Sequence, residues 1–413
     1  MAEAKLTVLQ VLPALQSGGV ERGTLEIAAA LVNAGHRALV MSAGGRMVEE
    51  LQALGAEHFT WPIGNKSLLA LRLVTPLRCF LAEQKVDILH VRSRFPAWIA
   101  YLAWRRMDPG RRPRFITTVH GLYSVNAYSR IMTRGEAIIA VSATVRDYLL
   151  QHYPDIVPER IEVIHRGVSG AAYPYGYRPA EAWKSAFFRQ YPEAAGKQLL
   201  TLPGRVTRLK GHEAFIEILA ELVREGRPVH GLIAGGASGS KQRYLVELQK
   251  MVRALGLAGH ITFTGQRQDL KDILAISHLV LSLSSQPESF GRTTLEALRL
   301  GVPVAGYNHG GVGEILRSVY PAGCLPLHDR DAGLAKIRSL LDGAPAVPAG
   351  NFFPLAAMLE RTLDLYARLA NSPSSPHPRP LSPQAERGEE DTPAPTSERG
   401  EPPSPPRRGR GPG

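Results

Sequence analysis

The chain has 413 residues, too many for one typical hydrophobic core, so its length indicates about two domains of roughly 150–200 residues each. Its hydrophobic fraction of 44% and charged fraction of 21% are ordinary for a soluble globular protein, and no apolar run approaches the roughly 18 residues of a membrane-spanning helix. The formal net charge of +12 indicates an anionic partner, for which nucleic acid, phospholipid head groups and phosphorylated substrates all qualify.

Two features of the chain favour the cytoplasm as its location. Its two cysteines, Cys79 and Cys324, lack the CxxC spacing of a metal site, which fits a reducing compartment. The first residues, MAEAKLTVLQVLPAL, lack the basic region and cleavage pattern of a signal peptide. We therefore expect them to begin the fold as its first strand.

Short β-rich runs alternate with helical patterns along most of the chain. Strands are predicted first over residues 7–15, 38–44, 86–91, 115–121, 137–142 and 161–167. After a break near residues 170–195, where YPYGYRPAEAW is typical of a linker, they are predicted over 198–205, 229–236, 261–265, 279–285 and 302–307. Such apolar strands form parallel sheets covered on both faces. The repeated rhythm predicts an α/β protein with two doubly wound, Rossmann-like domains facing each other across a cleft.

The end of the chain differs from everything before it. Residues 371–413 are rich in proline, serine and charge, with almost no apolar side chain to bury. Six arginines are balanced there by five glutamates and one aspartate, so the excess positive charge lies before residue 371. We expect a disordered tail that supplies no basic arm for nucleic acid.

Ligands of doubly wound sheets bind beyond the carboxyl ends of the strands, so residues that follow predicted strands are candidates. Gly18 and Gly19, in SGGVER, would let the backbone approach a ligand at a helix start that favours an anion; a plain tight turn is the alternative. The turn does not match the G-x-G-x-x-G dinucleotide fingerprint. His120, in TVHGLYS, is either a structural histidine or a hydrogen-bonding partner of a sugar hydroxyl or the reacting centre.

A basic loop, LPGRVTRLKGHEAF (202–215), is the more specific motif for an anion. It places Arg205, Arg208 and Lys210 between a strand and the start of a helix. Three cations beside a helix N-terminus suit a phosphate or a diphosphate. An exposed basic loop without a ligand is the alternative.

The stretch SQPESFGRTTLEALRLGVP (285–303) carries two glutamates. Glu288 lies in the loop after a strand, and Glu296 lies in the following helix, where it suits a ribose diol. The backbone N–H groups of Ser289, Phe290 and Gly291 at the helix start suit an anion. A hydrolase with paired carboxylates is the rival interpretation, but the basic loop favours a phosphate ligand. The sequence shows no D-x-D-like acidic cluster, so we do not expect a divalent metal site.

The segment VRSRFPAWIAYLAWRRMDPGRRPR (91–114) combines many arginines with one aspartate. Its candidate residues are Arg92, Arg94, Arg105 and Arg106, interleaved with Trp98, Tyr101 and Trp104. This mixture suits an anionic membrane surface or a phosphorylated, lipid-linked acceptor. A solvated basic helix is the alternative.

In content and order, these motifs resemble those of the retaining GT-B glycosyltransferases of glycosyltransferase family 4, over about residues 5–370. The resemblance rests on SGGVER, VHG, GRVTRLKGHE, FTGQRQDL, the E-x7-E pair Glu288 and Glu296, and NHGGVGEIL. It implies a GT-B fold with an acceptor-side domain over 1–180, a nucleotide-sugar domain over 181–350 and a helix over 351–370 that crosses back to the first domain. The tail over 371–413 lies outside the pattern, and Gly313 stands where many members have proline.

The resemblance also implies roles for single residues. Arg205 and Lys210 would bind the donor diphosphate beside Gly18 and Gly19, in place of a metal, so no metal or cofactor is expected. Glu296 would hold the ribose. Glu288 would contact the donor sugar, and His120 would be the active-site histidine near the reacting sugar.

The implied activity is the retaining transfer of a hexose or N-acetylhexosamine from a nucleoside-diphosphate sugar, expected to be UDP-linked. The expected acceptor is an envelope glycan or a lipid-linked molecule of the lipopolysaccharide-core kind, reached from the cytoplasm or the inner face of the plasma membrane. A nucleotide-sugar epimerase of the same fold, which needs no acceptor, is one alternative. The other is a basic nucleic-acid-binding module, for which no RRM, KH or helix-turn-helix pattern is present.

Overall fold

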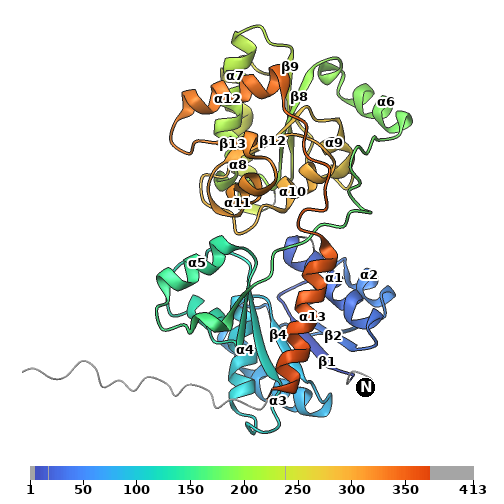
Figure 1. Cartoon of the computed structure of the whole chain (residues 1–413), viewed down its shortest axis with the longest axis vertical. Helices are drawn as coiled ribbons and strands as arrows, with labels where there is room; N and C mark the ends of the chain where they lie inside the picture. The colour runs from blue at the N-terminus through green and yellow to red at the C-terminus, as the bar shows by residue number, and fades with distance from the viewer. Residues whose placement is uncertain (1–4, 17, 238, 373–413) are drawn as a thin grey trace, which may run out of the picture. The chain divides into compact units, whose positions relative to one another are not determined.

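The computed structural model describes residues 5–16, 18–237 and 239–372, which lie in one compact unit. The predicted disordered tail falls almost wholly outside these residues. Two separate parallel sheets organise the chain (Figure 1), and each is described below with its helices as the N-terminal or the C-terminal half.

The N-terminal half is built on a seven-stranded sheet of order β3-β2-β1-β4-β5-β6-β7, in which all neighbouring strands are parallel. Its strands are β1 (Thr7–Val11), β2 (Arg37–Ser42), β3 (Glu57–Thr60), β4 (Ile88–Val91), β5 (Arg114–Val119), β6 (Ala137–Ala140) and β7 (Ile161–Val163). Its helices are α1 (Gly19–Asn33), α2 (Val48–Ala53), α3 (Val74–Glu83), α4 (Arg94–Arg105) and α5 (Ala143–His152), with short 3-10 turns η1 (Leu68–Leu73), η2 (Ser129–Thr133) and η3 (Pro158–Arg160).

Successive strand residues of this sheet enter different apolar clusters. On β1, Leu9 and Val11 belong to one apolar cluster and Val8 to the other. On β4, Leu89 belongs to the first of these clusters and Ile88 to the second. Side chains alternate between the two faces of a strand, so a strand that is apolar at every position needs cover on both. This burial explains why the runs lack the polar alternation of a strand with one solvated face.

The C-terminal half is built on a six-stranded sheet of order β10-β9-β8-β11-β12-β13, again wholly parallel. Its strands are β8 (Gln198–Pro203), β9 (Val229–Ala234), β10 (Ile261–Phe263), β11 (Leu279–Ser282), β12 (Val304–Tyr307) and β13 (Cys324–Leu325). Its helices are α6 (Glu181–Gln190), α7 (His212–Arg224), α8 (Gln242–Ala254), α9 (Leu270–Ile276), α10 (Arg292–Arg299), α11 (Gly310–Val319) and α12 (Arg330–Gly343), with 3-10 turns η4 (Pro192–Ala194), η5 (Arg208–Lys210), η6 (Gly239–Lys241) and η7 (Pro321–Gly323).

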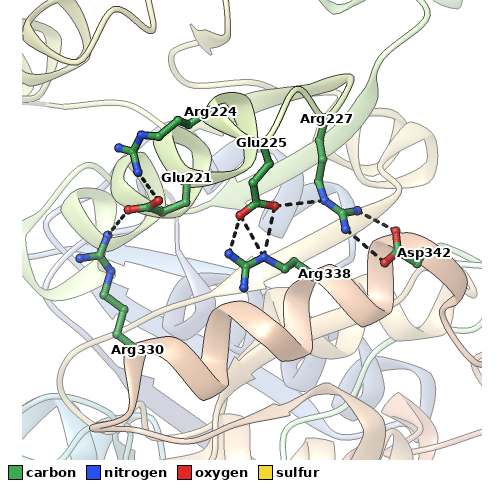
Figure 2. A network of polar contacts seen from close by, with 7 residues as sticks. All are labelled: Glu221, Arg224, Glu225, Arg227, Arg330, Arg338 and Asp342. Atoms are coloured by element: carbon green, nitrogen blue, oxygen red, sulfur yellow. Dashed lines mark hydrogen bonds and ion pairs between the residues drawn. The ribbon is translucent and has the colours of Figure 1, made fainter.

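A row of ion pairs joins the end of α7 to α12 (Figure 2). Arg227 binds Asp342 at 2.7 Å, Arg330 reaches Glu221 at 3.3 Å, and Arg338 pairs with Glu225. These groups are largely open to solvent, which screens their attraction. The row therefore aligns the two helices more than it stabilises them.

The last helix, α13 (Leu355–Asn371), packs against the N-terminal half although it follows the second sheet in sequence. Figure 1 shows it running beside α1. Met358, Leu365 and Tyr366 are buried in the same apolar cluster as residues of α1. The Tyr366 hydroxyl also hydrogen bonds to Nδ1 of the buried His90 at 2.6 Å. The chain thus returns to its first sheet.

The predicted α/β class with two doubly wound parallel sheets is confirmed. Two strands were not predicted, β3 and β13, and both are short edge strands. The sequence of β3, EHFT, is partly exposed and polar, so it lacks the apolar run of a central strand. The predicted linker near residues 170–195 contains the helix α6.

Candidate active site

Several of the predicted site residues lie just beyond the carboxyl ends of strands, and some of them contact one another. His120 follows β5, and the loop of Ser289 follows β11. The Ser289 hydroxyl donates a hydrogen bond to the His120 carbonyl oxygen at 2.7 Å, which joins the strand ends of the two halves. This is the edge at which ligands of doubly wound sheets bind.

Gly18 and Gly19 form the turn between β1 and α1, as predicted. Gly18 has a φ of 144°, which disfavours any other residue, and a Cβ there would lie 2.7 Å from a carboxylate oxygen of Glu21. Gly19 is exposed, and a Cβ on it would meet no described atom within 4 Å. The turn therefore leaves the start of α1 open for a ligand.

Lys210 and Glu288 form the central ion pair of the site. Lys210 Nζ lies 2.8 Å from Glu288 Oε1, and the Ser284 hydroxyl donates to the same carboxylate. Burial acts to raise the pKa of Glu288, but the Lys210 ammonium, the Ser284 hydroxyl and His309 together hold that pKa below its ordinary value. Glu288 is therefore an ionised carboxylate that accepts hydrogen bonds.

Gly211 sets the position of Lys210. It has a φ of 75°, and a Cβ on it would lie 1.9 Å from the carbonyl oxygen of Leu283. The basic loop can thus pack directly on the end of β11 only because residue 211 has no side chain. This close approach brings Lys210 next to the loop that carries Glu288.

The other two cations of the basic loop differ from each other. Arg205 is exposed, and its side chain has no ion-pair or hydrogen-bond partner among the described residues. Burial raises the pKa of Glu21, and the charge of Arg205 is one of those that oppose this rise. Arg208 pairs with Glu213 at 3.4 Å and with Glu247, and it lies over the ring of Tyr244. Arg208, one of the three predicted anion-binding cations, therefore has two carboxylate partners within the chain.

Glu296 is 7% exposed and accepts a hydrogen bond from Arg292 Nε at 2.9 Å. Burial raises its pKa, and Arg292 and the Tyr173 hydroxyl oppose that rise. Arg292 also binds Glu26 of α1 at 2.8 Å. Glu296 thus belongs to an ion network that sequence reasoning missed, since its members are far apart in the chain.

The start of α10 combines one buried ring with an open backbone. Phe290 is buried, with its ring centroid 5.8 Å from that of Phe353. Gly291 caps the helix with a φ of 94°, and a Cβ on it would lie 2.6 Å from Val312. The side chain of Phe290 therefore serves packing, and only the backbone N–H groups of this segment remain to meet an anion.

His120 presents a neutral imidazole. Burial, with the charges of Arg92 and Arg166, holds its pKa well below the ordinary value. Its Nε2 atom is buried without a hydrogen-bond partner in the described part of the chain. A neutral ring with one free nitrogen can exchange a hydrogen bond with a sugar hydroxyl.

The arginine-rich segment does not form one basic surface. Arg92 is only 3% exposed, and Tyr101 and Trp104 are buried against Phe115, whereas Trp98 is half-buried, so two of the three rings lie in the core. The helix α4 turns its apolar face inward, because these rings fill the core beside the sheet.

The remaining arginines of the segment lie nearer the surface. Arg94 is half-buried over the ring of Tyr123 and donates to Ser129, whereas Arg105 and Arg106 are exposed. Near the end of α4, Arg78, Lys85, Arg106 and Arg111 line an open groove of about 650 Å³.

Glu314 has a structural position that the sequence did not reveal. Its carboxylate accepts hydrogen bonds from the backbone N–H groups of Ala143 and Thr144, at the start of α5. It also lies 2.6 Å from Nε2 of His165. Glu314 therefore helps to hold α11 against the N-terminal half.

Comparison with known proteins agrees with this architecture. Residues 17–170 match the family model "Glycosyltransferase Family 4", and residues 184–347 match "Glycosyl transferases group 1", which together take in more than half of the chain. A glycosyltransferase structure from Rickettsia africae superposes with a TM-score of 0.77 at 27% identity, covering 89% of this chain and 100% of that chain.

Two further proteins illustrate the range of relatives. Anabaena Alr3699/HepE, whose structure contains UDP and glucose, has a TM-score of 0.70 at 20% identity, covering 88% of this chain and 100% of that chain. D-inositol 3-phosphate glycosyltransferase of Rhodococcus opacus is 31% identical over 193 residues, which are 46% of this chain and 42% of that protein. The match thus spans less than half the length of this curated relative.

Proposed function

Because the chain belongs to the glycosyltransferases of the family 4 and group 1 type, with their GT-B fold, we propose that it transfers a sugar from a nucleoside-diphosphate donor. The sugar is a hexose or N-acetylhexosamine, the donor is UDP-linked, and the anomeric configuration is retained. The acceptor is an envelope glycan or a lipid-linked molecule of the lipopolysaccharide-core kind.

One observation carries this proposal. The Lys210–Glu288 pair and the exposed Arg205 lie at strand ends of the C-terminal half, and Arg205 is near enough to Glu21, beside the glycine turn at the start of α1, for its charge to act on that carboxylate. Two cations and two helix starts form a strong site for a diphosphate. A carboxylate held ionised beside them accepts hydrogen bonds from sugar hydroxyls. The arrangement suits a sugar joined to a diphosphate better than either group alone.

The chemistry follows from the charges that develop during transfer. When the bond from the anomeric carbon to the diphosphate breaks, negative charge grows on the leaving oxygen and positive charge on the sugar. Arg205 and Lys210 stabilise the leaving diphosphate, and each well-placed donor contributes about 3 kcal/mol. Because these side chains supply the positive charge, the proposed reaction needs no metal.

The remaining side chains orient the sugar. Glu288 and His120 accept or donate hydrogen bonds at the sugar hydroxyls, and Glu296 binds the ribose once it exchanges its contact with Arg292. The acceptor hydroxyl attacks from the same face as the leaving group, and a leaving phosphate oxygen takes its proton. The carbon–oxygen bond to the acceptor forms as that to the diphosphate breaks, so the configuration is retained.

The donor can be identified by a thermal-shift screen of nucleoside-diphosphate sugars against the full chain, since a cognate donor stabilises the folded state. The selected donor is then incubated with and without envelope glycan and lipid-linked acceptors, and the products are separated. We expect a glycosylated product only with an acceptor. An altered sugar formed from the donor alone would instead identify an epimerase.

A further inference from the structure

Two buried arginines and a half-buried histidine lie at the strand ends of the N-terminal half. Arg92 follows β4, His120 follows β5 and Arg166 follows β7; we call these three residues the inner basic cluster. Arg92 is 3% exposed and Arg166 is 7% exposed. Buried arginines are rare unless a partner neutralises them, so their surroundings indicate what they bind.

The charges of the two arginines are incompletely balanced. Arg92 donates to Gln10 Oε1 at 2.9 Å, with no carboxylate within ion-pair distance among the described residues. Arg166 donates to the Gly19 carbonyl at 2.6 Å and lies 3.8 Å from Glu26, which Arg292 binds more closely at 2.8 Å.

The pKa values of these groups reflect the same imbalance. Burial lowers the pKa of Arg92 to about 10, and burial together with the Arg92 charge lowers that of Arg166 to about 9. Glu21 interacts with both arginines at longer range, but burial raises its pKa. An added anion would therefore stabilise the cluster.

Unused hydrogen-bonding groups are found in all three members. Within the described residues, the Nε atoms of Arg92 and Arg166 and the Nε2 atom of His120 are buried without a hydrogen-bond partner. Leaving such a group unpaired in the interior is costly, and more so when it is charged. Buried polar groups of folded proteins are nearly always paired, so three unpaired groups in one cluster indicate a ligand.

Helix α1 is shaped to accommodate Arg166. A Cβ on Gly23 would lie 2.3 Å from Nη2 and 2.7 Å from Nη1 of Arg166. The guanidinium group therefore lies against the backbone of α1, in space that exists only because residue 23 is glycine. This fit fixes the orientation of the planar group, which favours recognition of a phosphate or carboxylate.

We propose that the inner basic cluster binds an oxyanion of the acceptor, so that the acceptor carries a phosphate or carboxylate group near the hydroxyl that is glycosylated. The inference rests on the proposed function. All three members come from the N-terminal half, whereas the cations proposed for the donor diphosphate, Arg205 and Lys210, come from the C-terminal half. The cations proposed for the two anions thus come from different halves of the chain.

The test is a calorimetric titration of inorganic phosphate into the full chain, with malonate as the titrant in a parallel experiment. In both, the chain is first saturated with UDP or with the nucleoside diphosphate that the donor screen selects. We expect saturable binding of one of these anions, at least tenfold weaker in Arg92→Met and Arg166→Met. Stronger binding of phosphate or of malonate identifies the group on the acceptor. The matched control is Arg37→Met, at the opposite end of the sheet, which should bind like the wild type.

Two further measurements keep the result interpretable. Gly23→Ala displaces the Arg166 guanidinium without removing its charge, and it should also weaken anion binding. Thermal unfolding without the anion should show no loss of stability in Arg166→Met, because that change removes an incompletely balanced buried charge.

The inference would be overturned if the anion competed with UDP and if its binding were lost in Arg205→Ala but kept in Arg166→Met. It would also be overturned if neither anion showed saturable binding. UDP binding is measured in the same experiment. Its absence would contradict the proposed function, whereas UDP binding without anion binding would overturn only the acceptor site.

Discussion

At the scale of single residues, the site depends on a carboxylate whose ionisation is enforced by a neighbouring cation. Glu288 lies in a mostly buried position that disfavours its charge, and Lys210 reverses that preference at 2.8 Å. The pair therefore has two roles. It holds the Glu288 carboxylate ionised in the folded chain, and in the proposed reaction it presents one cation and one carboxylate to a donor. Substitutions can separate these roles.

Replacing Lys210 by methionine should lower both stability and transfer, since it leaves the Glu288 carboxylate buried with Ser284 as its remaining described partner. The double variant Lys210→Met/Glu288→Gln removes the uncompensated charge, so its Tm should recover toward the wild type. Its transfer rate should still be lower by roughly 100-fold or more, because the cation at the diphosphate is absent. Recovery of transfer together with stability would contradict the proposed role of Lys210.

The same pair predicts a dependence of stability on pH. The pKa of Glu288 is lowered in the folded state, so its contribution is present above the unfolded pKa of about 4.5 and is lost as pH falls through the lower folded value. Denaturant unfolding at several pH values should show Lys210→Met less stable than the wild type at neutral pH, with a difference that vanishes in acid. A constant difference would show that the pair is not the cause.

At the scale of elements, the loop that carries Lys210 depends on the backbone conformation of Gly211. Gly211 and Gly226 have nearly equal φ values, 75° and 76°, but a Cβ on Gly226 would meet no described atom within 4 Å. Gly226→Ala should therefore cost only the left-handed strain of about 1–2 kcal/mol. Gly211→Ala should cost more and should also reduce transfer. Equal losses of Tm in both variants would contradict the close approach to β11.

The helix α13 allows a second test at this scale. Tyr366→Phe removes the hydroxyl that bonds Nδ1 of His90, leaving a buried ring nitrogen without that partner. Such a loss costs roughly 1–3 kcal/mol, so the midpoint of denaturant unfolding should fall. An unchanged midpoint would show that α13 is held by its apolar face alone.

Local patterns in the sequence predicted most of these elements but few of their contacts. Apolar runs and glycine turns are local, so the central strands and the turns at Gly18 and Gly291 were found. The pairing of Arg292 with Glu26, and that of Glu314 with the start of α5, joins residues more than 150 positions apart. The burial of Trp104 was also missed, since only the packing of α4 decides which side faces the sheet, as was that of Arg92, which lies before α4 at the end of β4.

At the scale of the whole molecule, fewer residues support contact with an anionic membrane surface than the sequence suggested. None of the helices among the described residues is both long and apolar enough to cross a membrane. The exposed Arg105 and Arg106, with the groove lined by Arg78 and Arg111, remain as its support. Of the aromatic rings expected beside them, Tyr101 and Trp104 are buried and Trp98 is half-buried.

Flotation with anionic and neutral vesicles tests that surface. The wild type should float with anionic vesicles and less so at high salt, because the attraction is electrostatic. Arg106→Glu/Arg111→Glu should reduce flotation, whereas Arg224→Glu, an exposed change in the C-terminal half, should not. Equal recovery with neutral vesicles would contradict the proposal.

The central claim is that side-chain cations of this chain, without a metal, bind the diphosphate of a nucleotide-sugar donor. Calorimetric titration of UDP, GDP and ADP into the full chain in EDTA tests it directly, with Lys210→Met/Glu288→Gln and Arg205→Ala as variants and Arg37→Met as control. We predict that one nucleotide binds the wild type and the control equally well with or without EDTA, and binds both site variants at least tenfold more weakly. Binding that EDTA abolishes, or that survives unchanged in the site variants, would contradict the account.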